Sequence, residues 1–103
     1  MNATQKFTLF IDDNFHYMDE SERTFGGVFD SYEAALLRAG EIVERSLQEL
    51  FQPGMNAEML YQHYVMFGED PWILETSVGR LNFSAWNHAK DRCAQICASH
   101  RSA

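Results

Sequence analysis

The chain has 103 residues, of which 46% are apolar, and its 15 acidic against 8 basic residues give a formal net charge of −7. This length supports one domain, because two smaller ones could not each bury a useful core. We therefore expect a single domain over residues 1–103, with an ordered core of about residues 6–98. The acidic balance argues against nucleic acid as a partner, since phosphate binding needs a dense basic face.

No segment predicts export or membrane insertion. The early apolar run from Phe7 to Ile11 is too short for a signal sequence, and nothing approaches the roughly 18 apolar residues of a membrane span. Cys93 and Cys97 lie four apart on a predicted helix, a spacing that suits reduced thiols in a core rather than a disulfide. We expect a soluble protein of the cytoplasm that does not bind membranes.

The first two predicted elements are antiparallel strands. Residues 6–12 alternate between two sides with β-favouring residues, and residues 24–29 are the predicted return strand. Gly26 and Gly27 within the second strand predict a bulge or a close backbone contact. About ten residues join the two strands, whereas hairpin connections usually have two to five.

Three helices follow from apolar stripes at helical spacing. The longest is predicted over residues 32–51, with Ser31 or Asp30 as its N-cap. A shorter helix over residues 57–67 has Asn56 as its predicted N-cap.

The helix over residues 57–67 is expected to end at Gly68, which suits a C-terminal cap. The last helix runs from residue 85 to about residue 100 after Ser84, which can cap it. Between these helices, residues 72–76 read as a short third strand and residues 77–82 as a loop.

The predicted element order is β-β-α-α-β-α. Strands and helices in this order, without a βαβ alternation, favour an α+β fold. We expect a three-stranded antiparallel sheet with the helices on one face.

The densest group of charged and aromatic side chains occupies the long connection between the first two strands. A second group follows the short helix. Such residues suit either a solvated turn, in which Asp and Asn bond to nearby backbone, or a binding surface. The candidate binding surface consists of Asp12, Asp13, Phe15, His16, Tyr17, Asp19, Glu20, Arg23, Glu69, Asp70 and Trp72.

No recognised metal or catalytic pattern fits these residues. The connection lacks the glycine and the twelfth-position glutamate of a calcium loop, and it lacks the His-Glu-x-x-His of zinc peptidases. No Ser, Cys or Thr has a histidine and an orienting group in a recognisable arrangement. We therefore name no catalytic residue, metal site or cofactor, and we lean against an enzyme. Acid–base work by the connection's acids with Glu69 and Asp70 stays open.

Three motifs resemble a family of small uncharacterised bacterial proteins. They are Asp-Asp-Asn-Phe-His-Tyr-Met-Asp-Glu at residues 12–20, Gly-Met at 54–55 and Phe-Gly-Glu-Asp-Pro at 67–71. The likeness spans most of residues 6–98. Asn56 departs from the threonine that the family has as a helix cap, although asparagine caps equally well. The resemblance supports a single domain and implies no activity, cofactor or partner.

The leading interpretation is a non-enzymatic interaction or regulatory module. It would bind an unknown protein partner or a second copy of itself, and a homodimer is the concrete expectation because small aromatic-rich chains often bury surface against a partner. The alternative is a protein that binds a small ligand or a divalent metal, possibly as an enzyme, through residues 12–22.

Overall fold

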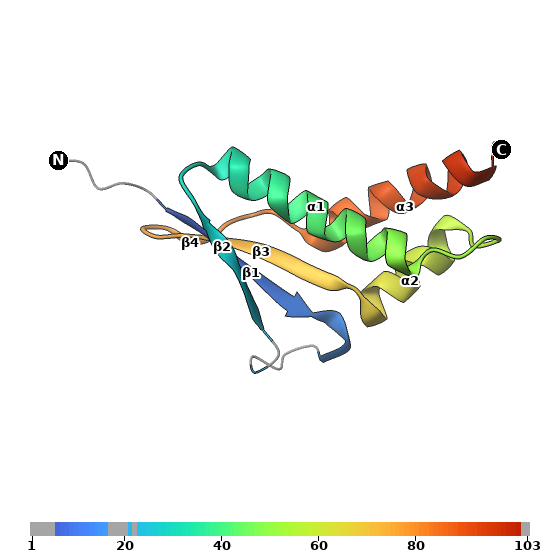
Figure 1. Ribbon diagram of the computed structural model, residues 1–103, viewed down its shortest axis with the longest axis horizontal. Helices are drawn as coiled ribbons and strands as arrows, with labels where there is room; N and C mark the ends of the chain where they lie inside the picture. Colours follow the sequence, from blue (N-terminus) through green and yellow to red (C-terminus); the bar gives the residue numbers. More distant parts are fainter. Residues whose placement is uncertain (1–5, 17–20, 22, 102–103) are drawn as a thin grey trace.

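A computed structural model describes residues 6–16, 21 and 23–101 of the chain (Figure 1). The elements form an α+β fold with a four-stranded antiparallel sheet of strand order β2-β1-β3-β4. In chain order they are β1 (Phe7–Asp13), the 3-10 helix η1 (Asn14–His16), β2 (Thr24–Phe29), α1 (Tyr32–Leu50), α2 (Ala57–Phe67), β3 (Glu69–Glu75), β4 (Gly79–Arg80) and α3 (Ala85–Arg101).

The prediction of three strands is wrong by one, because β4 lies in the segment expected to be a loop. It pairs with the end of β3, Arg80 opposite Leu74 and Gly79 opposite Glu75. Gly79 has a φ of 104°, which a residue with a side chain rarely adopts, and this allows the tight reversal. A strand of two residues is too short to show a period of two, so the sequence could not reveal it.

The third strand also begins three residues earlier than predicted. It pairs along all of β1, from Glu75 opposite Phe7 to Glu69 opposite Asp13. Pro71 is tolerated inside it because the missing N–H falls on the side away from β1, where β4 does not reach. Long-range pairing with β1 therefore extended the strand beyond its local signal.

The hairpin of β1 and β2 confirms the predicted pair of strands and the predicted bulge. Phe10 pairs with Phe25 and Leu9 with Gly27, so Gly26 is an extra residue. A Cβ on Gly26 would lie 3.0 Å from Leu9 Cδ2 and 3.1 Å from Leu9 O. The position is thus both a bulge and a close contact, and glycine is the residue that fits it.

The predicted helix caps are found at the three N-termini. Ser31 Oγ, Asn56 Oδ1 and Ser84 Oγ each accept a hydrogen bond from the backbone N–H three residues later. Gly68 ends α2 as predicted, although its backbone is extended (φ −81°) rather than left-handed. The reason for glycine there is space, because a Cβ would lie 2.7 Å from Tyr64 Cε1 and 2.8 Å from Tyr64 O.

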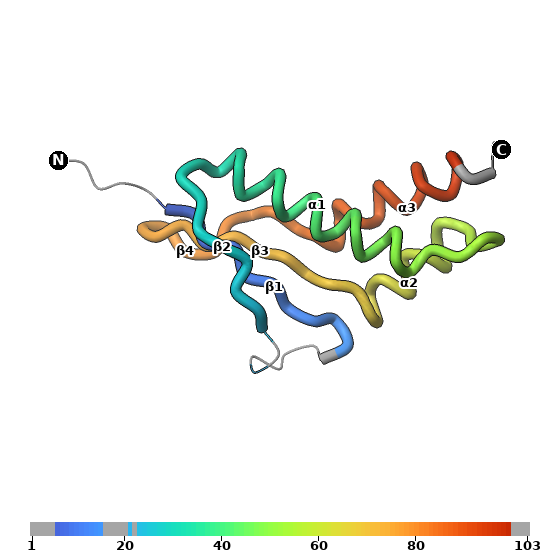
Figure 2. The backbone as a smooth tube through the Cα atoms, in the orientation of Figure 1, coloured from blue at the N-terminus to red at the C-terminus, as the bar shows by residue number. Residues whose placement is uncertain are grey.

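Two hydrophobic clusters share α1. The first part of this helix lies over the strands and the second part lies beside α2 and α3 (Figure 2). The sheet cluster joins the strands to the first part of α1 and consists of Phe7, Leu9, Ala35, Ala39, Ile42 and Ile73. The helical cluster joins the second part of α1 to α2 and α3 and consists of Val43, Leu47, Leu60, Tyr64, Ala85, Ala89, Cys93, Ile96 and Cys97.

The cysteines are core residues, as the sequence predicts. Cys93 and Cys97 are free thiols, each 1% exposed. Burial, and then the neighbouring Cys97, raise the pKa of Cys93 to about 11, which keeps it a protonated, unreactive thiol. Among the described helices, none combines the length and the hydrophobicity needed to cross a membrane.

The sheet has one covered and one open face. Helix α1 crosses the covered face, and no described helix crosses the opposite one (Figures 1 and 2). Leu9 and Ile73 point to the covered face and are 0% exposed. Their neighbours Phe10 and Trp72 point to the open face, because successive side chains of a strand alternate.

Candidate functional site

An aromatic row crosses the open face over three strands. Phe25 of β2 meets Phe10 of β1 edge to face, with ring centroids 6.3 Å apart, and Phe10 lies 5.0 Å from the ring of Trp72 on β3. Because Gly26 is an extra residue, Phe25 and Val28 share this face. Their exposed fractions are 62% and 53%, so the outer end of the row is accessible.

Two arginines cover the inner end of the row. The guanidinium carbons of Arg23 and Arg80 lie 4.9 Å and 4.7 Å from the centroid of the Trp72 ring. Trp72 is consequently only 8% exposed. Its Nε1 finds no hydrogen-bond partner among the described residues. The sequence placed Trp72 on the binding surface, whereas the structure places it beneath that surface.

Arg23 also joins β2 to β1 through Asp12. Its Nε donates to Asp12 Oδ1 at 2.7 Å and its Nη2 donates to Asp12 Oδ2 at 3.3 Å. This two-bond geometry fixes the plane of the guanidinium, which at the same time stacks on Trp72. The pair therefore orders the start of β2, just after the long connection.

Asp12 and Asp70 lie directly opposite each other on β1 and β3, and on the same face. Burial is the main cause that raises the pKa of Asp70 to about 6. The positive charge of Arg80 works against this rise, and the negative charge of Asp12 adds to it. The acids that the sequence analysis left open as a pair across space do meet in the sheet.

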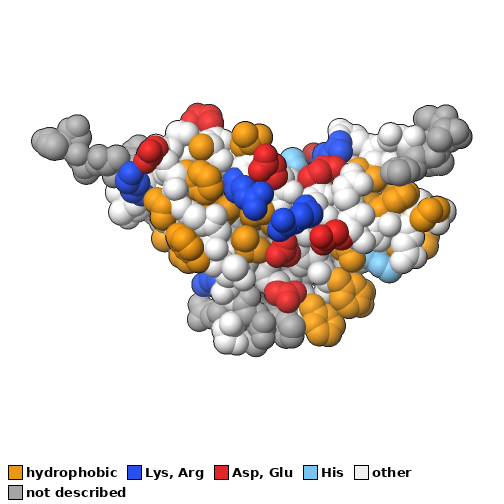
Figure 3. Space-filling view, in the orientation of Figure 1, with side chains coloured by type: hydrophobic (Ala, Val, Ile, Leu, Met, Phe, Trp, Pro, Cys, Tyr) orange, Lys and Arg blue, Asp and Glu red, His pale blue; other side chains and the backbone are white. Residues whose placement is uncertain are grey.

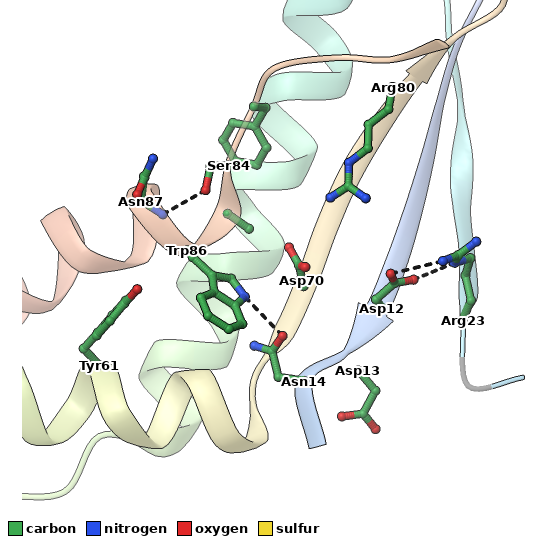
Figure 4. Close-up of a pocket in the computed structure, with 12 residues that line it drawn as sticks. Asp12, Asp13, Asn14, Arg23, Tyr61, Asp70, Arg80, Ser84, Trp86 and Asn87 are labelled. Atoms are coloured by element: carbon green, nitrogen blue, oxygen red, sulfur yellow. Dashed lines mark hydrogen bonds and ion pairs between the residues drawn. The ribbon is translucent and has the colours of Figure 1, made fainter. Parts of the chain in front are cut away.

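Asp70 also faces a cleft of about 670 Å³ that runs from the open face to the start of α3 (Figure 4). Carboxylates, guanidinium groups, amides and aromatic rings all line it. The lining residues are Asp12, Asp13, Asn14, Arg23, Tyr61, Asp70, Arg80, Phe83, Ser84, Ala85, Trp86 and Asn87.

Asn14 anchors the end of the cleft. Its Nδ2 donates to Tyr64 O at 2.9 Å, and its Oδ1 accepts a hydrogen bond from Trp86 Nε1 at 3.2 Å (Figure 4). Its backbone N–H donates to Gly68 O at 3.0 Å. At 7% exposure this one amide ties η1 to α2 and α3, and it fixes the indole that forms a wall of the cleft.

The structure divides the predicted binding surface. Asp12, Asp13, Arg23 and Asp70 converge on the cleft. Glu69 alternates to the other face, where its carboxylate lies 3.8 Å from Arg45 Nη2. Alternation along β3 thus separates two neighbouring acids that the sequence analysis grouped together.

The first residues of the long connection form both a turn and a surface. Asp13 Oδ1 accepts a hydrogen bond from Phe15 N, as expected of a turn aspartate. Phe15 does not fold into the core: it is 63% exposed and stacks on Phe67 with centroids 5.6 Å apart. Figure 3 shows hydrophobic side chains gathered at the lower right, where η1 meets the end of α2. Tyr17, Asp19, Glu20 and the side chain of His16 lie outside the described part.

Several residues of the site were missed from the sequence. Phe10 and Phe25 were treated only as strand residues, although the bulge at Gly26 and the alternation along the first strand could have placed both rings on one face. Arg80 was assigned to a loop, and only its pairing with β3 brings it beside Asp70. Trp86 packs against the helical cluster and also lines the cleft.

No group of three or more His, Cys, Asp or Glu side chains within residues 6–16, 21 and 23–101 is placed to hold a metal ion. A metal site that includes His16, Asp19 or Glu20 stays a prediction, because these side chains are not described. Comparisons with protein-family models, with curated proteins and with solved structures find no match to this chain, and the family resemblance of residues 12–20 and 67–71 stays a prediction.

Proposed function

We propose that the chain is a non-enzymatic interaction module that pairs with a second copy of itself through the open face of the sheet. The observation that carries this proposal is the exposure of Phe25 and Val28 at the end of the aromatic row. Large apolar side chains that lie together on an uncovered sheet face are typical of a surface that a partner covers.

Charge favours a second copy as that partner. The chain is strongly acidic, so two copies repel each other over most of their surfaces. The open face carries both signs, with Arg23 and Arg80 beside Asp12 and Asp70. A two-fold symmetric interface brings the same patch from both copies together, so the arginines of one copy can face the aspartates of the other.

The test is the oligomeric state of a matched set of variants. We expect the wild-type protein to sediment as a dimer at high micromolar concentration, and the Phe25→Ser/Val28→Ser double variant as a monomer. Leu37→Ser is the control, because Leu37 is 68% exposed but lies on α1, away from the open face. We expect this control to remain dimeric.

Two outcomes would contradict self-association through this face. One is a monomeric wild-type protein at high micromolar concentration. The other is a dimer that survives the double substitution but is lost with Leu37→Ser, which would place the interface on α1. A monomeric wild-type chain could instead capture a different protein from the native host, and the double variant could abolish that capture. This result would show that the open face is an interface, but that its partner is another protein and not a second copy.

A further inference from the structure

We propose that the cleft beside β3 binds a zwitterionic small molecule of the α-amino acid class with an apolar side chain. This binding function goes beyond self-association and does not depend on it. The geometry that points to it is a pair of opposite charges, Asp70 and Arg80, that face the same cleft (Figure 4). No ion pair joins the two side chains among those found in the described part of the chain.

Among the described residues, none donates a hydrogen bond to the carboxylate of Asp70, and burial has removed part of its water. The opposing Asp12 cannot help, because it is an acid itself and is already bound by Arg23. An ammonium group in the cleft would supply both charge and hydrogen-bond donors to Asp70.

The guanidinium of Arg80 is positioned by an aromatic ring. It stacks on the Trp72 ring at 4.7 Å, and no ion pair of Arg80 is found within the described residues. Stacking fixes the plane of a guanidinium and leaves its N–H groups directed sideways. Such a fork matches a ligand carboxylate, which can accept two parallel hydrogen bonds.

The rest of the lining selects the side chain of the ligand. Trp86, Tyr61 and Phe83 contribute aromatic surface to the cleft, and Asn14 fixes the Trp86 indole. A cleft of about 670 Å³ has room for a small molecule with an apolar group. An apolar side chain on these rings would be removed from water.

A ligand with a single charge fits this cleft less well. A simple anion would find Arg80 but would lie beside Asp70 and Asp13, and a simple cation would find Asp70 but would lie beside Arg80. A zwitterion satisfies both charges at once. The amino and carboxylate groups of an α-amino acid are close together on one carbon, as adjoining opposite charges require.

The experiment is a titration of the ¹⁵N-labelled protein, followed by two-dimensional NMR. The probes are phenylalanine and leucine, with phenylalaninamide and N-acetylphenylalanine as matched compounds that lack the carboxylate or the ammonium charge. We expect both amino acids to shift the signals of Asp70, Arg80 and the Trp86 indole. Each matched compound should bind about tenfold or more weakly, because it loses one charge-assisted contact.

Substitutions in the protein test the same two charge interactions that the matched compounds test in the ligand. Asp70→Asn and Arg80→Gln should each weaken phenylalanine binding about tenfold. Asp91→Asn, on the exposed side of α3, is the matched control and should bind like the wild type. The Phe25→Ser/Val28→Ser variant should also bind normally, which separates the cleft from self-association.

Three outcomes would overturn the proposal. The first is the absence of shifts in the cleft at tens of millimolar phenylalanine and leucine. The second is equal binding of the amide or the N-acetyl compound, which needs no variant and so does not depend on a variant folding. The third is a loss of binding in Phe25→Ser/Val28→Ser, which would show that one chain alone does not form the site.

Discussion

The two faces of the sheet are built from the same strands but are stabilised by different interactions. On the covered face, Leu9 and Ile73 are fully buried by α1 through aliphatic packing. Phe10 follows Leu9 on β1, and Trp72 precedes Ile73 on β3, so both rings lie on the open face. They pack against each other, and two arginine side chains cover the Trp72 ring. Helix packing buries one face, whereas the side chains of two arginines shelter the other.

Under the proposed function, this difference separates the residues that stabilise the fold from those that bind a partner. Tight aliphatic packing has no alternative arrangement of similar energy, so the covered face fixes the fold. Guanidinium groups stacked on a ring keep hydrogen-bonding capacity at their edges, and the proposed self-association would use that capacity on the open face. Four predictions test this division, from the largest expected effect to the smallest.

Truncation on the covered face should cost far more than truncation on the open face. Leu9→Ala removes a fully buried side chain and should lower the free energy of unfolding by about 3–5 kcal/mol. Val28→Ala, at 53% exposure, should lower it by less than about 1 kcal/mol. Urea unfolding of both variants measures the difference. Equal losses would show that the open face is part of the core.

The stability of the region where the open face meets the cleft, at the end of β1, should depend on the side-chain amide of Asn14. Asn14→Ala removes the acceptor of the Trp86 indole N–H and one of the two donors to Tyr64 O, which keeps the N–H of Gly68, at a cost of about 1–3 kcal/mol. Asn87→Ala, whose exposed side chain lies on α3, is the control and should be nearly neutral. Thermal unfolding of both variants tests this expectation. A neutral Asn14→Ala would mean that water replaces the amide.

The pH dependence of the free energy of unfolding should reveal the raised pKa of Asp70 on the open face. Folding raises the pKa of Asp70 from 3.8 to about 6, so the folded state holds its proton more tightly. Its contribution to the free energy of unfolding is therefore largest below about pH 4 and falls as the pH rises to about 6.

Asp70→Asn removes this loss and should raise the free energy of unfolding at neutral pH by about 1 kcal/mol, a figure reduced because water still partly screens this partly buried group. The gain should vanish by about pH 4. Chemical denaturation of the variant and the wild type over this pH range measures it. A gain that does not change with pH would argue against a raised pKa.

The smallest effect is expected from the ion pair at the edge of the open face. Arg23→Gln removes the two bonds to Asp12 and should cost about 0.5–1 kcal/mol, because the pair is partly exposed. It should also uncover the Trp72 ring and shift the indole fluorescence to longer wavelength. An unchanged emission spectrum would show that Arg23 does not shelter the ring.

Local signals in the sequence predicted most of the elements and few of the contacts. The residue before each helix was identified as its cap because capping involves neighbours only three residues apart. The two-residue β4 and the early start of β3 were missed, since both depend on pairing partners elsewhere in the chain.

The same limit applies to the site. Asp12 and Asp70 were both candidates, but their meeting depends on the register between β1 and β3, which one sequence does not reveal. The position of Arg80 follows from β4, which was missed. The bulge at Gly26 was predicted, yet its effect of placing Phe25 and Val28 on one face requires the register to be known.

The division of α1 between two hydrophobic clusters has a consequence for how the chain unfolds. Ala35 and Ile42 belong to the sheet cluster, and Val43 and Leu47 belong to the helical cluster one step further along the same helix. Neither cluster can lose its order without breaking the backbone hydrogen bonds of a helix that the other still needs. Thermodynamic cooperativity between the two halves is thus built into one continuous helix, and the middle of α1 should be the last region to exchange its amide protons with solvent.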